Sequence, residues 1–544
     1  MNTLTGNRII PAYLEFHAAS RPNQTALITE TRAGVLQSLT WSELDALSNQ
    51  AGNWTLAQGL EHNDSIVIHL PNSLELLVLW LAASKSGAVA VPVDPGSTVA
   101  ELRYIVDHSD ARLVVTEAGS LDVARAACNG CPKLARIVTT SLADPVAFGE
   151  LGQEVKAQSA ARPNAALGPL DVAGMLYTSG TTGKPKGVML THAAYLYGAE
   201  VFARATALRA VDRHLIALPL HHAAAQCHAM TPSLVAGASM VIMERFRASR
   251  FLAQAVRHNA TRAALFAAPL RMLLRHHVGS VVPGSPLELV TFAQNLTAEE
   301  MNEWETRFRI PLMQLWGMTE TVGLPLMASL HGLRDNMCMG FPVAGYDVRI
   351  VDESSDEVAT GVPGEILVRA EPGWNVTSGY YKNALATNHL FRNGWLYTGD
   401  RARRDRHGQF HFLGRFKEMI KRAGENISPL EVEDVLKSHP AVLEAAVVGV
   451  PDSLRDERVI AFVAFREAQA ATADELKLWC LKSLSAFKVP EEFNVCAEFP
   501  RTSVGKLQRH LLRHSLLEQH AGSANCHSRS VSQSFGPESE SETE

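Results

Sequence analysis

Residues 177–188 read YTSGTTGKPKGV and concentrate groups that suit a polyphosphate. The three glycines let the backbone approach an anion closely and expose its N–H groups. The anion-binding residues expected here are Thr178, Ser179, Gly180, Thr181, Thr182, Gly183, Lys184 and Lys186. The segment is not a Walker loop, because Lys184 is followed by Pro185 rather than by Ser or Thr. We therefore expect a polyphosphate loop of another class.

Six further motifs accompany this loop in a definite order along the chain. They are LAASKSGAVAVPVDP (81–95), LPLHHAAA (218–225), WGMTE (316–320), YTGD (397–400), GRFKEMIKRAGENISPLEVE (414–433) and PRTSVGKLQR (500–509). With them the chain resembles the adenylate-forming superfamily, which includes acyl- and aryl-CoA synthetases, non-ribosomal peptide adenylation domains and firefly luciferases. Each short motif is weak evidence alone, whereas their joint occurrence in this order is specific.

The resemblance implies attack of a carboxylate on the α-phosphate of ATP. Such a reaction depends on positioning two anions, balancing negative charge and stabilising pyrophosphate, with little need for a protein base. The loop at 178–186 is implied to hold the β- and γ-phosphates. Thr319 and Glu320 match positions that contact the α-phosphate and coordinate Mg²⁺, and Thr181 is a second expected metal ligand. Mg²⁺ is implied because ATP would otherwise repel the incoming carboxylate.

Four residues match positions that recognise the nucleoside or act on the reacting groups. Asp400 would accept hydrogen bonds from both ribose hydroxyls, and Arg415 would make a second ribose or phosphate contact. Trp316 stands where the family often has Tyr and would stack on adenine. Lys506, in SVGKL, matches the catalytic lysine whose ammonium bridges the substrate carboxylate and the α-phosphate.

The same resemblance implies that a small C-terminal domain rotates between two catalytic poses. One pose presents Lys506 for adenylation, and the other presents the 417–432 face for thiol transfer. Lys417 matches the hinge position, where a few residues absorb a large backbone change. Lys421 and Gly424 fall on the segment that would line the pantetheine tunnel of coenzyme A, where glycine permits close backbone approach.

The acyl substrate is constrained by departures from the family pattern. His222 stands where amino-acid adenylation domains carry Asp, and a neutral His offers an ammonium no counter-charge, so an amino acid is disfavoured. Gln294 and Asn295 replace a small-residue run, so they either change the adenine contact or narrow the acyl site. The pair at 226–227 and the run at 295–297 are similar to the carnitine/crotonobetaine-CoA ligase branch. A specialised-metabolite acid and an aryl acid are equally open.

The sequence between these motifs predicts alternating strands and helices, which would hold the motifs in place. SIVIHL (65–70), GAVAVPV (87–93) and DARLVVT (110–116) predict buried strands, and residues 74–85 predict a helix between the first two. This alternation indicates α/β layers with mainly parallel sheets. Residues 346–351 and 364–369 alternate more regularly with polar residues and predict a β-rich region near the end of the large domain.

A smaller domain is expected after residue 413. Residues 430–438 and 472–484 predict helices, the second with a capping box at Thr472 and Glu475, and residues 441–450 and 459–465 predict strands. We expect a large N-terminal domain of layered α/β sheets with a β-rich subdomain at 1–413. A small, mobile α+β domain at 414–516 and a disordered tail at 517–544 complete the chain.

Composition excludes several classes of protein. The net charge of −6 with no basic block argues against nucleic acid as a partner. The seven scattered cysteines do not form a disulfide framework. The N-terminus has no signal-peptide pattern, and the longest apolar stretch, 74–84, is too short to span a membrane. We therefore expect a cytoplasmic protein with no membrane span.

The expected function is ATP-dependent activation of a small-molecule carboxylic acid to an acyl-AMP, followed by thioesterification to coenzyme A. The cofactors implied are ATP, Mg²⁺ and coenzyme A. The alternative is a stand-alone adenylate-forming enzyme that hands the acyl group to a carrier protein or partner enzyme. A luciferase-like oxygenase has no specific support, and a non-catalytic sensor would be expected to lose Lys506 or Glu320, which are both present.

Overall fold

The computed structural model describes residues 4–31, 34–140, 149–178, 184–276, 284–332, 338–415, 418–422, 425–452, 456–484, 486–502, 505 and 507–528. The chain divides into two compact units, Met1–Phe412 and Leu413–Glu544. The division falls next to the boundary that we placed after residue 413. Each unit is described by itself.

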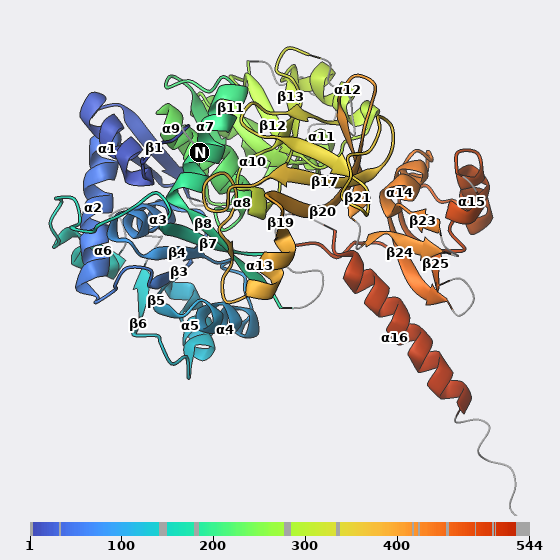
Figure 1. Ribbon diagram of the computed structural model, residues 1–544, viewed down its shortest axis with the longest axis horizontal. Helices are drawn as coiled ribbons and strands as arrows, with labels where there is room; N and C mark the ends of the chain where they lie inside the picture. The colour runs from blue at the N-terminus through green and yellow to red at the C-terminus, as the bar shows by residue number, and fades with distance from the viewer. Residues whose placement is uncertain are drawn as a thin grey trace, which may run out of the picture. The chain divides into compact units, whose positions relative to one another are not determined.

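A first sheet in unit 1 carries the strands around the phosphate loop (Figure 1). Among the described residues its order is β18 (Gly379–Tyr380), β8 (Lys186–Thr191), β7 (Val172–Thr178), β4 (Val89–Pro92), β3 (Ser65–His69), β5 (Ala111–Glu117) and β6 (Arg136–Thr140). Strands β4, β3, β5, β6 and β7 pair in parallel, and β8 turns back antiparallel to β7. The predicted strands at 65–70, 87–93 and 110–116 are thereby confirmed.

Both faces of this sheet are covered by helices, which explains why its strands are apolar throughout. Ile66, Ile68 and Ala90 point to the face covered by α3 (Leu74–Ser86). The intervening Val67 and Val91 point to the face covered by α4 (Val99–His108) and α5 (Leu121–Cys128). Figure 1 shows α4 and α5 beside β5 and β6. The helix predicted at 74–85 is confirmed as α3.

A second sheet in unit 1 joins a parallel part to an antiparallel part. Within the described residues its order is β16 (Val348–Val351), β17 (Gly364–Arg369), β20 (Trp395–Arg404), β21 (Phe410–Arg415), β15 (Cys338–Pro342), β14 (Leu326–Met327), β13 (Leu312–Trp316), β12 (Leu289–Ala293), β11 (Arg262–Phe266), β9 (Arg213–Ile216), β10 (Ser239–Met243), β1 (Thr25–Glu30) and β2 (Leu36–Thr40), with β19 (Phe391–Arg392) on β20. The pairs from β10 to β13 are parallel and those from β13 to β17 are antiparallel. The antiparallel part is the predicted β-rich region.

The other helices of unit 1 pack around these two sheets. They are α1 (Ile10–Ser20), α2 (Trp41–Ala57), α6 (Gly149–Lys156), α7 (His192–Ala205), α8 (Ala223–Ala225), α9 (Thr231–Ala236), α10 (Ala248–Arg257), α11 (Ala267–His276), α12 (Ala298–Phe308) and α13 (Ala384–Leu390).

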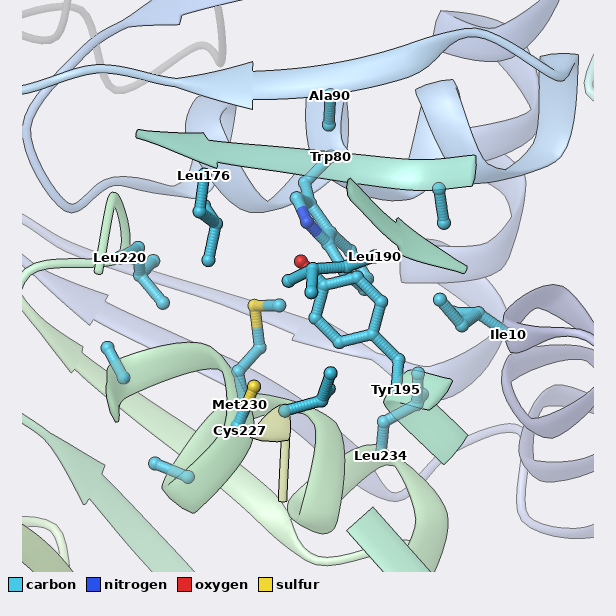
Figure 2. Close-up of a cluster of buried hydrophobic side chains, with 14 of the residues drawn as sticks. Ile10, Trp80, Ala90, Leu176, Leu190, Tyr195, Leu220, Cys227, Met230 and Leu234 are labelled. Atoms are coloured by element: carbon cyan, nitrogen blue, oxygen red, sulfur yellow. The ribbon is translucent and has the colours of Figure 1, made fainter. Parts of the chain in front are cut away.

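The main core of unit 1 lies between the first sheet and the segment from α7 to α9. Figure 2 shows Trp80 of α3 beside Tyr195 of α7, with Met230 and Cys227 on the other side of the tyrosine. The Trp80 and Tyr195 rings meet edge to face, with centroids 5.4 Å apart and an interplanar angle of 89°. Such a pair contributes about 1 kcal/mol beyond the apolar area that it buries. The core thereby fixes α3 and α7 against the sheet that bears the phosphate loop.

Unit 2 is a small α+β fold around a third sheet. Within the described residues this sheet has the order β23 (Glu425–Ile427), β22 (Ile420–Arg422), β25 (Asp456–Phe465) and β24 (Val442–Asp452), with β26 (Glu492–Val495) on β25. Helices α14 (Pro429–Lys437) and α15 (Ala473–Leu481) bury Leu436 and Leu476 against it. The predicted capping box is present, since Glu475 N–H donates to Thr472 Oγ1 at 3.2 Å and Thr472 N–H to Glu475 Oε2 at 2.8 Å.

Helix α16 (Arg509–Ser528) extends beyond residue 516, where we expected the folded part to end. Leu512 and Leu516 bury against the face of the sheet opposite α14 and α15, and the helix then continues to Ser528. The sequence after Leu516 lacks the apolar residues of a core but, apart from Gly522, is rich in residues that tolerate a helix. Low apolar content therefore did not mark the end of the helix. Residues 529–544 of the expected tail lie outside the described residues.

Within the described part of the chain, no helix is both long enough and apolar enough to cross a bilayer.

Buried histidines make the folded state sensitive to acid. Burial lowers the pKa of His214 to about 3 and that of His192 to about 4. In the unfolded chain both side chains titrate near the ordinary value of about 6.5, so below that pH the unfolded state binds more protons than the folded state. The contribution of these neutral histidines to stability is therefore fully present above about pH 6.5, and it is lost as the pH falls toward their pKa values in the folded state.

We expect the free energy of unfolding to decrease as the pH falls from about 6.5 to about 5, by at most about 1.4 kcal/mol per pH unit for each such histidine, and the urea midpoint to decrease with it. Carboxylates with lowered pKa, such as Asp212, act in the same direction only near and below their ordinary range. Urea unfolding followed by tryptophan fluorescence at a series of pH values measures the slope, and His214→Gln should flatten it. A midpoint that is constant over this range would contradict the assignment.

Candidate active site

The polyphosphate loop connects two antiparallel strands. Thr178 at the end of β7 lies opposite Lys186 at the start of β8. This antiparallel pairing fixes the two ends of the loop side by side. Ser179, Gly180, Thr181, Thr182 and Gly183 lie outside the described residues. The structure therefore places Thr178, Lys184 and Lys186 of the predicted set.

Helix α4 holds both ends of this loop. Tyr104 Oη donates to the carbonyl oxygen of Pro185 at 2.7 Å, and Lys184 Nζ lies 5.6 Å from the centre of the Tyr104 ring. One turn further along, His108 Nδ1 lies 2.8 Å from the hydroxyl of Tyr177, the residue before Thr178. Residues four apart lie on one helix face, so a single face of α4 contacts the entry and the exit of the loop.

Glu320 lies on a short 3-10 turn, Thr319–Thr321, directly after β13. Its carboxylate is 7% exposed and accepts a hydrogen bond from Tyr380 Oη at 2.7 Å. The turn is tightly packed, because a Cβ added to Gly323 would lie 2.0 Å from Tyr346 Oη. Only glycine fits that position, and the close packing fixes where Glu320 can lie.

Tyr380 also contacts the lysine that follows the loop. Lys186 Nζ lies 4.8 Å from the centre of the Tyr380 ring, within the range of a cation–π contact. Tyr380 belongs to β18, which pairs with β8, the strand of Lys186. One buried tyrosine therefore connects the loop exit with the carboxylate expected to bind Mg²⁺.

Trp316 and Asp400 are in direct contact. The indole Nε1–H donates to Asp400 Oδ2 at 2.9 Å, and the Asp400 residue is 4% exposed. Trp316 ends β13 and Asp400 lies within β20, so the contact joins two strands of the second sheet that β14, β15 and β21 separate. A hydrogen bond that a carboxylate accepts is strong, because the acceptor is charged. The bond from Trp316 therefore orients the Asp400 side chain.

Three expected site segments are thus brought together by side-chain contacts: the loop exit at Lys186, the motif at residues 316–320, and Asp400. Thr319 lies on the same turn as Glu320 and is half-buried. Tyr380 and Tyr104 were not predicted, because a tyrosine in an apolar strand or helix carries no signal of such contacts.

The remaining predicted residues belong to unit 2, whose placement against unit 1 is not described. Arg415 ends β21, and Lys421 lies in β22 with its side chain outside the described set. Lys417, Gly424 and Lys506 lie outside the described residues. The roles of all five stay predictions.

His222 follows β9 and lies beside a second histidine. The His221 and His222 ring centroids are 4.5 Å apart, and His221 Nε2 lies 3.7 Å from Asp94 Oδ2. Burial and the neighbouring His221 lower the pKa of His222 to about 3, and burial lowers that of His221 to about 4. Both rings are therefore neutral at pH 7, which agrees with the lack of a counter-charge expected at this position.

Two other residues singled out in the sequence make structural contacts. The Gln226 side chain accepts from Tyr195 Oη and donates to the Leu220 carbonyl, both at 2.6 Å, and it is fully buried. Asn295 Oδ1 accepts from Gln314 Nε2 at 2.8 Å, which ties the end of β12 to β13. Gln226 therefore has a structural role in the core, and Asn295 has one between two neighbouring strands.

Comparison with known proteins identifies the family of the chain. The family model of the AMP-binding enzyme matches residues 14–381, and that of the AMP-binding enzyme C-terminal domain matches residues 431–506. A crotonobetaine/carnitine–CoA ligase of Proteus mirabilis is 32% identical over 496 residues, which cover 90% of this chain and 96% of that protein. The corresponding ligase of Citrobacter koseri is also 32% identical, over 499 residues that cover 89% and 95%.

Solved structures of similar fold cover nearly the whole chain. ATP-bound MatB from Rhodopseudomonas palustris has a TM-score of 0.85 at 28% identity, covering 94% of this chain and 99% of that chain. The anthranilate CoA ligase AuaEII in complex with anthranoyl-AMP has a TM-score of 0.85 at 26% identity, covering 94% and 97%. These matches confirm the predicted fold class. The chain belongs to the AMP-binding enzyme family, in the acid–CoA ligase branch of the adenylate-forming enzymes.

Proposed function

We propose that this chain activates a carboxylic acid with ATP to form an acyl-AMP and then transfers the acyl group to coenzyme A, releasing AMP. Membership of the AMP-binding enzyme family supports the first step. CoA ligases among the relatives and among the similar structures support the second. The chain is thus an AMP-forming acid–thiol ligase.

One observation carries the assignment of the ATP site. Lys186, Tyr380 and Glu320 form one run of contacts, and Trp316, four residues before Glu320, contacts Asp400. At one end of the proposed site, the cation of Lys186 and the buried carboxylate of Glu320 suit a metal-bound triphosphate. An aromatic ring and a second buried carboxylate at the other end suit adenine and the vicinal ribose hydroxyls. ATP would therefore extend from Asp400 and Trp316 to Lys186.

The metal-binding chemistry fits Mg²⁺ delivered with ATP. Among the described residues no group of three or more His, Cys, Asp or Glu side chains forms a metal site. Mg²⁺ usually takes one or two carboxylates together with substrate phosphates and water, which matches the single carboxylate of Glu320. Glu320 would hold the ion, with Thr181 as the second proposed ligand. When bound, Mg²⁺ would neutralise phosphate charge that repels the carboxylate substrate.

The protein residues then contribute positioning and charge. Lys186 and the glycine loop would orient the β- and γ-phosphates as the leaving pyrophosphate, and Thr319 would contact the α-phosphate. Lys506 would bring its ammonium to the attacking carboxylate oxygen and to a phosphate oxygen. This electrostatic stabilisation is strongest in the transition state, where charge gathers on the α-phosphate.

For the second step we propose that unit 2 reorients about Lys417. Lys421 and Gly424 would then line the path of the pantetheine arm, and Arg415 would contact the ribose or a phosphate. A hinge of this kind removes Lys506 from the site when its charge is no longer needed. The division of the chain next to the 414–417 segment supports this proposal.

The acid is proposed to carry no free α-amino group. His222 is neutral at pH 7, because burial and His221 lower its pKa to about 3, so it cannot serve as a counter-charge for an ammonium. Crotonobetaine and carnitine, which name the activity of the relatives, are the first candidates to test. We also propose a cytoplasmic location, supported by the lack of a disulfide framework among seven cysteines.

The proposed activity is tested by acid-dependent exchange of radiolabelled pyrophosphate into ATP. The panel contains crotonobetaine, carnitine, benzoate, anthranilate, a medium-chain fatty acid and two amino acids. We expect exchange with at least one acid that has no α-ammonium, and AMP release that depends on added coenzyme A. Exchange with amino acids alone would contradict the proposed substrate class. AMP release that does not depend on added coenzyme A would favour transfer of the acyl group to a carrier protein or partner enzyme.

Lys506→Ala separates the two half-reactions. We expect adenylation to fall by about 10²–10³-fold, because one preorganised donor to the transition state is lost. Transfer of the acyl group from a pre-made acyl-AMP to coenzyme A should stay largely intact, since Lys506 would be withdrawn in that pose. The measurements are pyrophosphate exchange and thioester formation from synthetic adenylate.

Lys477→Ala is the matched control for this experiment. Lys477 lies in the same unit, is exposed on α15, and has no role in either proposed half-reaction. Substitution of an exposed side chain of this kind usually changes stability by less than about 0.5 kcal/mol, so both half-reactions should be retained. Equal damage to both half-reactions in Lys506→Ala would show that this lysine acts through folding rather than in adenylation.

A further inference from the structure

Tyr380 lies between two residues of the proposed ATP site and is 8% exposed. Its hydroxyl donates to Glu320 Oε1 at 2.7 Å, and its ring faces Lys186 Nζ at 4.8 Å. A buried carboxylate needs a donor, and a half-buried ammonium gains from an aromatic face. Tyr380 supplies both interactions from one side chain.

The backbone around Tyr380 is fixed to the same two segments. Tyr380 pairs with Val188 in β8, so its position is tied to the strand that follows the phosphate loop. Thr377 N–H donates to the carbonyl oxygen of Glu320 at 2.9 Å. The segment 377–380 therefore holds Glu320 by its main chain and by its side chain. A hydroxyl placed by two such anchors is preorganised before any nucleotide arrives.

We propose that Tyr380 is a positioning residue for the metal-binding carboxylate. Its O–H donates to Oε1 of Glu320 and would fix the carboxylate plane, which would leave the other oxygen, Oε2, available to Mg²⁺. Metal ligands are commonly oriented by such a hydrogen bond, and loss of the partner typically weakens metal affinity about 10–100-fold. The inference rests on the proposed function, because it assigns to Glu320 the role of metal ligand.

A purely structural role would give a different result. If the hydroxyl only satisfied a buried carboxylate, its removal would lower the stability of the protein and leave the Mg²⁺ dependence of ATP binding unchanged. The two roles are separated by Tyr380→Phe, which keeps the ring against Lys186 and removes the hydroxyl alone. ATP affinity by titration calorimetry, at several Mg²⁺ concentrations and without acid substrate, reports on the metal without requiring catalysis.

For Tyr380→Phe we expect the Mg²⁺ concentration that half-saturates ATP binding to rise about tenfold. AMP binding, measured without metal, should change less than twofold, because AMP engages Trp316 and Asp400 rather than Glu320. Tyr381→Phe is the matched control: the adjacent tyrosine donates its hydroxyl to Asp110 Oδ2 at 2.9 Å and not to Glu320. This variant should leave both affinities unchanged. An unchanged Mg²⁺ requirement in Tyr380→Phe would overturn the inference.

A double-mutant cycle with Glu320→Gln tests whether Tyr380 acts through the carboxylate. Glu320→Gln should itself raise the Mg²⁺ requirement, and adding Tyr380→Phe should then have little further effect. An equal effect of Tyr380→Phe in both backgrounds would overturn the positioning role while leaving the proposed function intact. If Glu320→Gln does not alter the Mg²⁺ requirement, the metal role within the proposed function fails, and the role inferred for Tyr380 fails with it.

Discussion

Two buried carboxylates define the proposed nucleotide site, and each accepts a hydrogen bond from an aromatic side chain. Glu320 accepts from Tyr380 Oη and Asp400 accepts from Trp316 Nε1. Burying a carboxylate is unfavourable unless hydrogen bonds replace the lost water, so the fold must supply these donors. The donor to Glu320 comes from β18 and the donor to Asp400 from the end of β13, so each carboxylate depends on contact between segments far apart in the chain.

The loop between β7 and β8 follows the same logic. Its ends are paired in the sheet, and one face of α4 contacts both of them. Fixing the two ends lowers the conformational entropy that the loop would lose on binding a phosphate. The proposed phosphate loop therefore depends on the regular elements that hold its ends.

Much of the fold was predictable from local pattern. The apolar strand at 65–70, the helix from Leu74 and the capping box at Thr472 are each encoded by neighbouring residues, and the structure confirms them. The phosphate loop was recognisable because polyphosphate chemistry demands particular residue types at close spacing, whereas the other site residues were assigned by resemblance to the family. The end of the folded part was placed too early, at residue 516, since helix propensity can extend a helix such as α16 beyond the last residue that packs on a core.

The supporting contacts could not be predicted in this way. Tyr380 and Glu320 are 60 residues apart in the chain, and Tyr104 and Pro185 are 81 apart. Such pairs depend on sheet order, which no local pattern in this single sequence specifies. For the same reason the sequence did not reveal that the Gln226 side chain forms hydrogen bonds with Tyr195 and Leu220 in the core.

The central claim is that ATP lies along one line from Asp400 to Lys186. A crystal structure of the chain with ATP and Mg²⁺ tests it most directly. The account predicts ribose hydroxyls at the Asp400 carboxylate, adenine against Trp316, and the metal between Glu320 and the triphosphate beside Lys186. A nucleotide bound elsewhere, or one whose metal does not touch Glu320, would contradict it.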